Sequence, residues 1–186
     1  FNSLFLKALK DLDFLLGCIG KRSFLLKKYI ILNESKLIKL FNSKKMKFKN
    51  KDIKNNTLIE IPSITNFFML FADLNNNLIN RNLIKSLKIY YKNEKYLFPS
   101  INSKHKSFEE ERYWRGPVWI NCNWIIYQGL KNKDKNLAKI IRKKTINLVE
   151  KKKFREYYSC KSGLGMGANN FSWSAALYLD FKLNRS

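Results

Sequence analysis

The sequence predicts an all-α fold of about seven helices paired as antiparallel hairpins, and three observations carry this prediction. Apolar residues recur at helical spacing through most of the 186 residues. A hydrophobic content of 45% is sufficient for a packed core. Long connections alternate with short ones, which suits a toroid of helical hairpins better than a four-helix bundle. The long loops should line a pocket at one end of the hairpins.

Each helix is expected where the apolar spacing is continuous and turn residues interrupt it. Gly17 and Gly20 end the first helix, and Asn33 either separates the next two or lies within one longer helix. Pro62 and an N-cap Ser63 begin a later one. The expected helices cover residues 2–19, 22–32, 34–41, 63–74, 78–91, 119–130, 134–152 and 171–183.

Two segments lack helical periodicity. Residues 42–56 are rich in Lys and Asn, so we expect an exposed hairpin or loop there. Residues 92–115 form a longer irregular segment that ends in a cluster of aromatic residues. A loop of that length inside a compact domain usually lines a functional site, so we expect this segment to line one.

The chain is strongly basic, with 37 Lys and Arg against 14 Asp and Glu and a formal charge of +23. Such a balance favours nucleic acid or another polyanion as a partner. The lysines are nevertheless scattered among many Asn and Ile residues, as a general bias in composition produces. The charge therefore leaves nucleic acid open as a partner without requiring it.

The cysteines indicate neither a disulfide framework nor a metal site. Cys18, Cys122 and Cys160 are odd in number and far apart, and His105 is the single possible nitrogen ligand. They favour a reducing compartment, so we expect a cytoplasmic protein without metal or cofactor. No apolar run is long enough to cross a membrane, so no membrane partner is expected.

Residues 111–130 have the composition of a sugar-binding wall. Aromatic rings stack on the apolar C–H patches of a pyranose, while Arg and Trp N–H groups donate to its hydroxyls. Trp124 is expected in the core of its helix, whereas Trp114, which precedes the helix, is expected in the pocket. The residues concentrated here are Tyr113, Trp114, Arg115, Gly116, Pro117, Trp119 and Trp124.

A second stretch, residues 154–173, offers one acid beside two tyrosines and before a glycine-rich loop. A carboxylate among aromatic residues can act as a general base toward water, although a solvated charge at a helix end is the ordinary alternative for Glu156. No strand is expected before the glycines, so they fit a nucleotide-binding loop poorly. They would instead let the backbone pass close to a ligand or to Glu156. We expect the two stretches to form opposite walls of one pocket.

The same two stretches resemble a known family. The strings YWRGPVWINCNW at 113–124 and FREYYSCKSGLGMGANNFSWSAAL at 154–177 are similar to the signature segments of glycoside hydrolase family 63. Within that family they most resemble the mannosylglycerate and glucosylglycerate hydrolases. The opening FNSLFLKALKDL and the FPSI element at 98–101 are also similar to that branch, so the resemblance covers most of the chain.

The resemblance implies an inverting hydrolase of α-linked sugars at the centre of an (α/α) toroid of six hairpins. Residues 1–186 would be the C-terminal part of that single catalytic domain, with the N-terminal half absent. The Glu of the family's F-x-E-Y segment is the catalytic base, which implies Glu156. The residues implied for sugar binding are Tyr113, Trp114, Arg115, Gly116, Trp119, Tyr157 and Trp173.

The general acid of that mechanism is not expected in this chain. An inverting enzyme needs a second carboxyl about 6.5 to 9.5 Å from the base. The resemblance places this Asp upstream of Phe1, and Asp11 and Asp13 lie in the wrong context, so the chain alone should be inactive. Two positions depart from the family pattern: Lys153 stands where Gly is common, and Ser159-Cys160 replaces an Asp-Pro-like turn.

The sequence therefore predicts an inverting α-glycosidase whose partner is a small carbohydrate substrate. The substrate would be a small α-linked glucoside or mannoside, such as a glycosylglycerate or a short oligosaccharide. Two alternatives stay open: a basic helical module that binds RNA or another polyanion, and a sugar-binding relative without catalytic activity.

Overall fold

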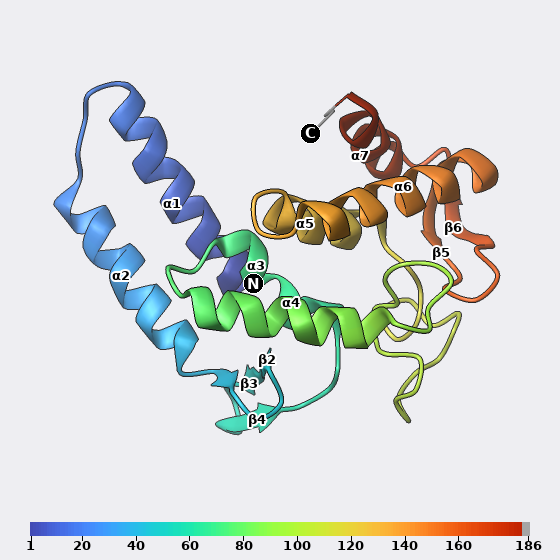
Figure 1. The fold of residues 1–186 in the computed structure, drawn as a ribbon, viewed down its shortest axis with the longest axis horizontal. Helices are drawn as coiled ribbons and strands as arrows, with labels where there is room; N and C mark the ends of the chain where they lie inside the picture. Colours follow the sequence, from blue (N-terminus) through green and yellow to red (C-terminus); the bar gives the residue numbers. More distant parts are fainter. Residues whose placement is uncertain (184–186) are drawn as a thin grey trace.

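The computed structural model describes residues 1–183, which form a mostly helical molecule with three small two-stranded sheets (Figure 1). The helices are α1 (Asn2–Cys18), α2 (Phe24–Ile38), α3 (Met69–Ala72), α4 (Asn77–Tyr91), α5 (Ile120–Leu130), α6 (Lys135–Lys152) and α7 (Ser172–Leu183), with a 3-10 turn η1 (Ile64–Phe67). The strands are β1 (Phe41–Asn42), β2 (Lys47–Phe48), β3 (Asn50–Asp52), β4 (Thr57–Ile59), β5 (Arg155–Tyr158) and β6 (Gly165–Asn169). A mainly helical fold is thus confirmed, and three short hairpins of strands are added to it.

The core lies around α5, which packs against α3, α6 and α7, while α1 packs against α2 and α3 (Figure 1). On α6 the buried residues Leu137, Ile141 and Leu148 recur at helical spacing, which directs one face into this core. The side chain of Asp134 begins α6 by accepting a hydrogen bond from the Leu137 amide at 3.0 Å. The sequence pattern and the cap together account for this helix.

The structure decides between the two alternatives at Asn33: the chain forms one helix there, α2, in which the Asn33 side chain donates to the carbonyl of Tyr29 at 2.8 Å. One other expected helix differs from the structure. Residues 63–74 are divided between η1 and the single turn of α3, which ends at Asp73 with a φ of 55°. Ser63 is the N-cap of η1, as predicted. The Ser63 amide in turn donates a hydrogen bond to the side-chain oxygen of Asn66 at 2.8 Å.

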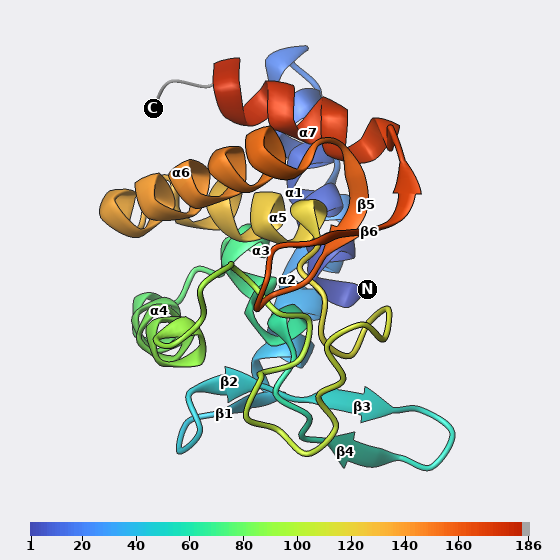
Figure 2. The same cartoon turned by 90° about the vertical axis from the view of Figure 1, so that its right-hand side faces the viewer.

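Residues 41–59 form two successive hairpins, β1–β2 and β3–β4. Figure 2 shows the β3–β4 hairpin extending away from the helices, as an exposed hairpin was expected to do. Phe48, in contrast, is buried at 5% exposure, and its carbonyl accepts a hydrogen bond from Asn66 at 2.8 Å. The first hairpin is therefore attached to η1, and the expectation of full exposure is wrong for it.

The long irregular segment between α4 and α5 is pinned to the core by a buried amide. The Asn123 side chain on α5 accepts from the Phe98 amide at 2.9 Å and donates to the Leu97 carbonyl at 2.6 Å. Single β-bridges then join Pro99 to Val118 and Val118 to Tyr158. The segment has few regular elements, but these bonds fix its path beside β5.

None of the helices in residues 1–183 combines the length and the apolar character needed to span a bilayer.

Candidate functional site

The β5–β6 hairpin positions Glu156. Tyr157 pairs with Met166 and Tyr158 with Gly165, and the register is irregular between Arg155 and Tyr157. The alternative that places Glu156 at a helix end is therefore wrong, and so is the expectation that no strand precedes the glycines. The strands are short, and the sequence REYY lacks the alternation of apolar and polar residues that identifies a strand.

A single β-bridge brings the two predicted stretches together. The Val118 amide donates to the Tyr158 carbonyl at 2.7 Å, and the Tyr158 amide donates to the Val118 carbonyl at 3.0 Å. Trp119 follows Val118 directly, and Glu156 lies two residues before Tyr158. Segments about forty residues apart in the sequence thus become neighbours across one pair of backbone hydrogen bonds.

The Glu156 carboxylate is half-buried and held at both oxygens. The Tyr113 hydroxyl donates to Oε1 at 2.9 Å, and the Ala168 amide donates to Oε2 at 3.1 Å. The hydrogen bond to Glu156 raises the pKa of the Tyr113 hydroxyl above its ordinary value of 10.0. Burial and the nearby Tyr157 hydroxyl raise this pKa by smaller amounts. Tyr113 is therefore a hydrogen-bond donor to the carboxylate throughout the neutral pH range.

Gly167 allows β6 to approach the carboxylate. It has a φ of 68°, and a Cβ atom there would lie 2.5 Å from Oε2 of Glu156. The expectation that the glycines let the backbone pass close to Glu156 is thus confirmed for Gly167. The other two glycines of the run lie against different side chains, Tyr96 for Gly163 and Arg155 for Gly165.

Four aromatic rings form a continuous surface beside Glu156, called the aromatic wall below: Tyr113, Trp114, Trp119 and Tyr157. The indoles of Trp114 and Trp119 stack with centroids 4.2 Å apart, and the ring of Tyr113 lies 4.8 Å from Trp119 and 5.4 Å from Tyr157. Trp119 is only 2% exposed, so it supports the wall from below. Tyr113 and Trp114 are 48% and 45% exposed, so they present the surface that a ligand could meet.

Arg115 and Gly116 shape the loop that carries Tyr113 and Trp114. The Arg115 guanidinium lies 2.8 Å from Glu109, which also binds Arg112 at 3.0 Å. Arg115 first, and Arg112 second, hold the pKa of the Glu109 carboxyl below its ordinary value. Gly116 sits so close to the Glu109 carbonyl that a Cβ would be 2.2 Å from it. Sequence reasoning missed Glu109, whose only signal was its place in a short acidic run before the aromatic cluster.

The start of α7 is joined to the same hairpin. The Ser174 hydroxyl donates to the Arg155 carbonyl at 2.7 Å, and the Phe171 amide donates to the Phe154 carbonyl at 3.0 Å. Trp173, between them, is 47% exposed, and its ring lies 6.3 Å from that of Phe171. The structure thus places Trp173 next to the β5–β6 hairpin, although its ring contact is with Phe171 and not with the aromatic wall.

Trp124 points to the other side of α5. Its indole N–H donates to the Asp180 carboxylate at 2.6 Å, and its ring packs edge-on against Phe71 with centroids 5.8 Å apart. It is partly buried against the core, as expected of a structural residue.

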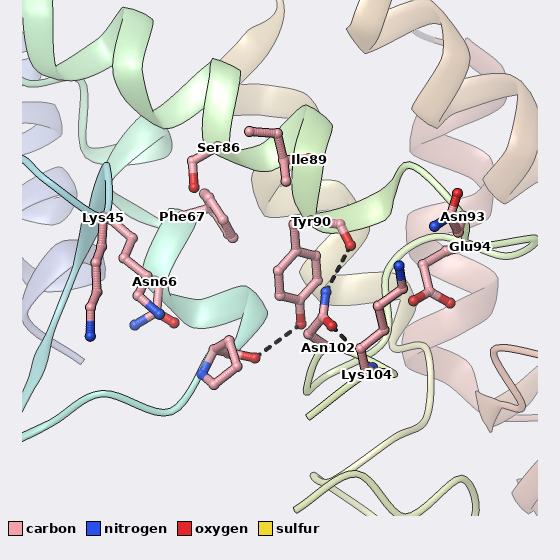
Figure 3. Close-up of a pocket in the computed structure, with 12 residues that line it drawn as sticks. Lys45, Asn66, Phe67, Ser86, Ile89, Tyr90, Asn93, Glu94, Asn102 and Lys104 are labelled. Carbon is pink, nitrogen blue, oxygen red and sulfur yellow. Dashed lines mark hydrogen bonds between the residues drawn. The ribbon is translucent and has the colours of Figure 1, made fainter. Parts of the chain in front are cut away.

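At the Glu156 site the two predicted stretches meet directly, through the Val118–Tyr158 bridge and the Tyr113–Glu156 hydrogen bond. The two stretches lie side by side in direct contact, so the expectation that they face each other across a pocket is wrong. A cavity of about 420 Å³ lies elsewhere, between the β1–β2 hairpin and the end of α4 (Figure 3). Two of its polar groups bond within the chain: the Tyr90 hydroxyl donates to the Pro99 carbonyl at 2.8 Å, and the Asn102 side-chain amide donates to the Tyr90 carbonyl at 3.0 Å. Within residues 1–183, no cluster of His, Cys, Asp and Glu has the arrangement of a metal site.

Comparison with known proteins assigns the chain to a family. The model of the mannosylglycerate hydrolase MGH1-like glycoside hydrolase domain matches residues 1–174. The mannosylglycerate hydrolase of Thermus thermophilus is 31% identical over 180 residues, which are 96% of this chain and 43% of that protein. The chain belongs to glycoside hydrolase family 63. Within it, this family 63 chain falls in the mannosylglycerate hydrolase-like branch.

Solved structures agree with this assignment. This family 63 chain superposes on the Thermus thermophilus mannosylglycerate hydrolase in complex with Tris with a TM-score of 0.93 and 31% identity, over 99% of this chain and 45% of that one. The neutral trehalase Nth1 of Saccharomyces cerevisiae shares the fold, with a TM-score of 0.74 at 16% identity. This family 63 chain spans less than half the length of these relatives.

Proposed function

We propose that this chain supplies the catalytic base and one wall of the sugar site of an inverting α-glycoside hydrolase. The observation that carries the proposal is the Glu156 carboxylate, fixed by Tyr113 and the Ala168 amide beside exposed indole and phenol rings. The family membership supports the class of reaction, and the relatives' names support mannosylglycerate or glucosylglycerate as the substrate.

The geometry suits a base because each carboxylate oxygen keeps accepting capacity after its one observed bond. In the proposed step, Glu156 takes a proton from a water molecule as the water oxygen bonds to the anomeric carbon. The glycosidic C–O bond breaks, and the leaving oxygen takes a proton from a second carboxyl group on the opposite face of the sugar. The Tyr113 hydroxyl and the Ala168 amide orient Glu156, and the aromatic wall stacks on the sugar ring.

The second carboxyl group would come from polypeptide outside these residues. Glu109 is held by Arg112 and Arg115, and Glu110 is held by the Ser159 hydroxyl and by Lys161 at 3.4 Å, so these nearby acids serve the loops. We further infer that the helical hairpins are part of an (α/α) toroid, because one exposed wall requires an opposite wall to enclose a sugar. On this proposal the chain alone is inactive.

The test uses a fusion in which the part of the Thermus thermophilus hydrolase that this chain does not match is joined to this chain. The fusion should hydrolyse mannosylglycerate or glucosylglycerate, and Glu156→Gln should lower kcat by about 10³-fold, within the range of general-base catalysis, with little change in KM. Single-turnover and steady-state kinetics measure both constants.

Glu150→Gln is the matched control, because Glu150 is also a carboxylate that accepts from a tyrosine hydroxyl, Tyr178 at 3.0 Å. It lies on α6 and should leave kcat unchanged. Full turnover in Glu156→Gln would show that Glu156 is not the base of the reaction. Absence of any glycoside hydrolysis by a folded fusion would refute the proposed function.

A further inference from the structure

The cavity of about 420 Å³ has the size of a small-molecule site, since ligand pockets range from about 300 to 1,000 Å³. Its walls come from the β1–β2 hairpin, η1, the last turns of α4 and the loop that follows α4 (Figure 3). None of the described residues that line it belongs to the aromatic wall or contacts Glu156. A ligand in this cavity would therefore be separate from the sugar substrate of the proposed function.

Hydrogen bonds within the chain fix the walls of this cavity. Asn66 joins the first hairpin to η1 by donating from its side chain to the Phe48 carbonyl at 2.8 Å. Asn102 joins the loop after α4 to both neighbours: its side chain donates to the Tyr90 carbonyl and its backbone amide to the Pro62 carbonyl, each at 3.0 Å. Because these walls are tied to one another, the cavity is preformed, as small-molecule sites usually are.

The two ends of the cavity differ in chemistry. In Figure 3, Lys45 and Asn66 lie at one end, Glu94 lies at the other, and the ring of Tyr90 lies between them. This ring packs edge-on against Phe67 with centroids 5.4 Å apart, so the middle of the cavity offers an aromatic surface. A ligand that spans the cavity would meet cations first, then aromatic rings, then a carboxylate.

The end at the β1–β2 hairpin has a surplus of positive charge. Lys45 and Lys49 share the carboxylate of Glu60, Lys49 at 2.7 Å. Lys47 lines the cavity and forms no ion pair within the described residues 1–183. Burial first, and Lys45 second, lower the pKa of Lys47 below its ordinary value of 10.5, although Glu60 acts in the opposite direction. An anion beside Lys47 would stabilise its charged form.

The rest of the cavity offers groups that bind hydroxyls. The Ser103 hydroxyl donates to one oxygen of the Glu94 carboxylate, which leaves the other oxygen to accept from a ligand. The Ser86 hydroxyl and the Asn93 side chain form no hydrogen bond within the part of the chain that the structure describes, and both line the cavity. Lys104 adds a donor near Glu94 (Figure 3). Glu94 would repel an anionic group, so the anionic group of a ligand belongs at the hairpin end.

We propose that this cavity binds a small phosphorylated polyol, such as a sugar phosphate, with its phosphate beside Lys47 and its hydroxyls toward Glu94. A phosphate monoester carries a charge of about −1.5 to −2 at neutral pH, so it balances the surplus at the hairpin better than a carboxylate does. Lysine binds phosphate as a point charge, and the C–H face of the polyol would lie on the ring of Tyr90.

Isothermal titration calorimetry of glucose 6-phosphate into the fusion tests this proposal in a complete domain. Inorganic phosphate should bind about tenfold more weakly or worse, because it cannot reach the groups around Glu94. Equal affinities would overturn the proposal in favour of a site for the free phosphate ion. Absence of glucose 6-phosphate binding by a folded fusion would also overturn it.

Substitution of Lys47 locates the phosphate. Lys47→Gln should weaken the binding of glucose 6-phosphate by about tenfold or more, whereas Lys47→Arg, which keeps the charge, should change it by less than about threefold. Lys44→Gln is the matched control, because it removes the same charge from the same hairpin at an exposed lysine in the turn between β1 and β2. Equal losses for Lys47→Gln and Lys44→Gln would reduce the effect to general attraction of charge and overturn the site.

Two variants of the Glu156 site separate this proposal from the proposed function. Glu156→Gln and Trp114→Ala should bind glucose 6-phosphate like the unsubstituted fusion, and Lys47→Gln should leave kcat for glycoside hydrolysis unchanged. Lost binding in Trp114→Ala with full binding in Lys47→Gln would place the ligand on the aromatic wall and contradict the cavity. Unchanged turnover in Glu156→Gln would count against the proposed function alone.

Discussion

Lys153 leaves α6 with a φ of 63° and a ψ of −175°, a backbone conformation that residues other than glycine seldom adopt. The strain serves the site, because it turns the chain from α6 into β5, where Glu156 lies. The Lys153 carbonyl is fixed in this turn by the Tyr158 hydroxyl at 2.7 Å. The family pattern often has glycine at this position, whereas this chain has Lys153. The departure therefore falls where the backbone conformation itself favours glycine.

Lys153→Gly should stabilise the chain by about 1 kcal/mol. Relief of about 1–3 kcal/mol of strain exceeds the loss of about 0.5–1 kcal/mol from the greater freedom of glycine in the unfolded chain. Denaturant unfolding measures the difference. Lys151→Gly, within α6, is the control and should destabilise by about 1 kcal/mol. Equal destabilisation by both changes would show that position 153 is not strained.

Gly167→Ala should damage the site. The added methyl group would meet Oε2 of Glu156 at 2.5 Å, and the φ of 68° adds strain. We expect at least a tenfold loss of kcat in the fusion, on the order of a lost charge-assisted hydrogen bond. Gly17→Ala is the control, because Gly17 lies in α1 with open space around it and the change should stabilise the helix by up to about 1 kcal/mol. Equal kcat for both variants would contradict the close approach.

The residues that touch Glu156 were only partly predictable from the sequence. Tyr113 and Gly167 stand out by residue type and by their place in unusual stretches. The Ala168 amide does not, because a backbone donor has no signature of its own. Glu109 was hidden because it is one of three consecutive glutamates, and only the fold shows that it is the one that binds Arg115.

At the scale of elements, helices were predictable, whereas strands were anticipated only as an exposed hairpin or loop over residues 42–56. Amphipathic spacing identifies α4, α5 and α6 because each buries several residues on one face. Strands of two to five residues have no room for a detectable alternation, and the first two hairpins are rich in Lys and Asn, which favour turns and exposed positions. The same shortness concealed β5 and with it the actual setting of Glu156.

The start of α6 allows a prediction with a defined pH dependence. Burial acts to raise the pKa of the Asp134 carboxyl, but hydrogen bonds from Lys88 and the Leu137 amide outweigh it and hold the pKa below 3.8. The ion pair between Asp134 and Lys88, at 2.7 Å, therefore stabilises the fold at every pH above the ordinary pKa of the carboxyl. This stabilisation is lost as the pH falls through the lower pKa that the carboxyl has in the folded chain.

Asp134→Asn should keep the N-cap and lose the charge, whereas Asp134→Ala should lose both. At neutral pH the Ala variant should be less stable than the Asn variant by about 1 kcal/mol, the value of a typical cap. The difference between the unsubstituted chain and Asp134→Asn should narrow as the pH falls from the ordinary value of 3.8 through the lower folded pKa, where the carboxyl becomes protonated. Thermal midpoints measured across this range test both points, and a pH-independent difference would contradict the role of the ion pair.

At the scale of the whole molecule, the apolar faces of the first two helices could not be oriented from the sequence. Leu12 and Leu15 on α1 and Leu25 on α2 are exposed, although their helical spacing is that of a core face. An apolar stripe looks the same in sequence whether it faces inward or outward, so only the fold shows its direction.

The formal charge of +23 also belongs to this scale, and we predict that it is diffuse and forms no nucleic-acid site. Acids interrupt the lysines in separate parts of the molecule, in ion pairs such as Lys49–Glu60, Lys133–Asp73 and Lys182–Glu150. Diffuse positive charge gives weak, non-specific binding that salt removes, whereas a built phosphate site gives clustered contacts. We expect dissociation constants for single-stranded RNA weaker than about 10⁻⁶ M at physiological salt.

The α6 helix offers the sharpest test, because Lys139 and Lys143 are exposed one turn apart on its outer face. Two double variants remove the same amount of positive charge: Lys139→Glu with Lys143→Glu on α6, and Lys51→Glu with Lys54→Glu on the β3–β4 hairpin. If the positive charge is diffuse, both variants should weaken RNA binding at low salt by the same factor. Fluorescence anisotropy at several salt concentrations compares the two variants. A much larger loss for the α6 pair, with a shallower salt dependence, would locate a phosphate-binding face on that helix and make a polyanion a true partner.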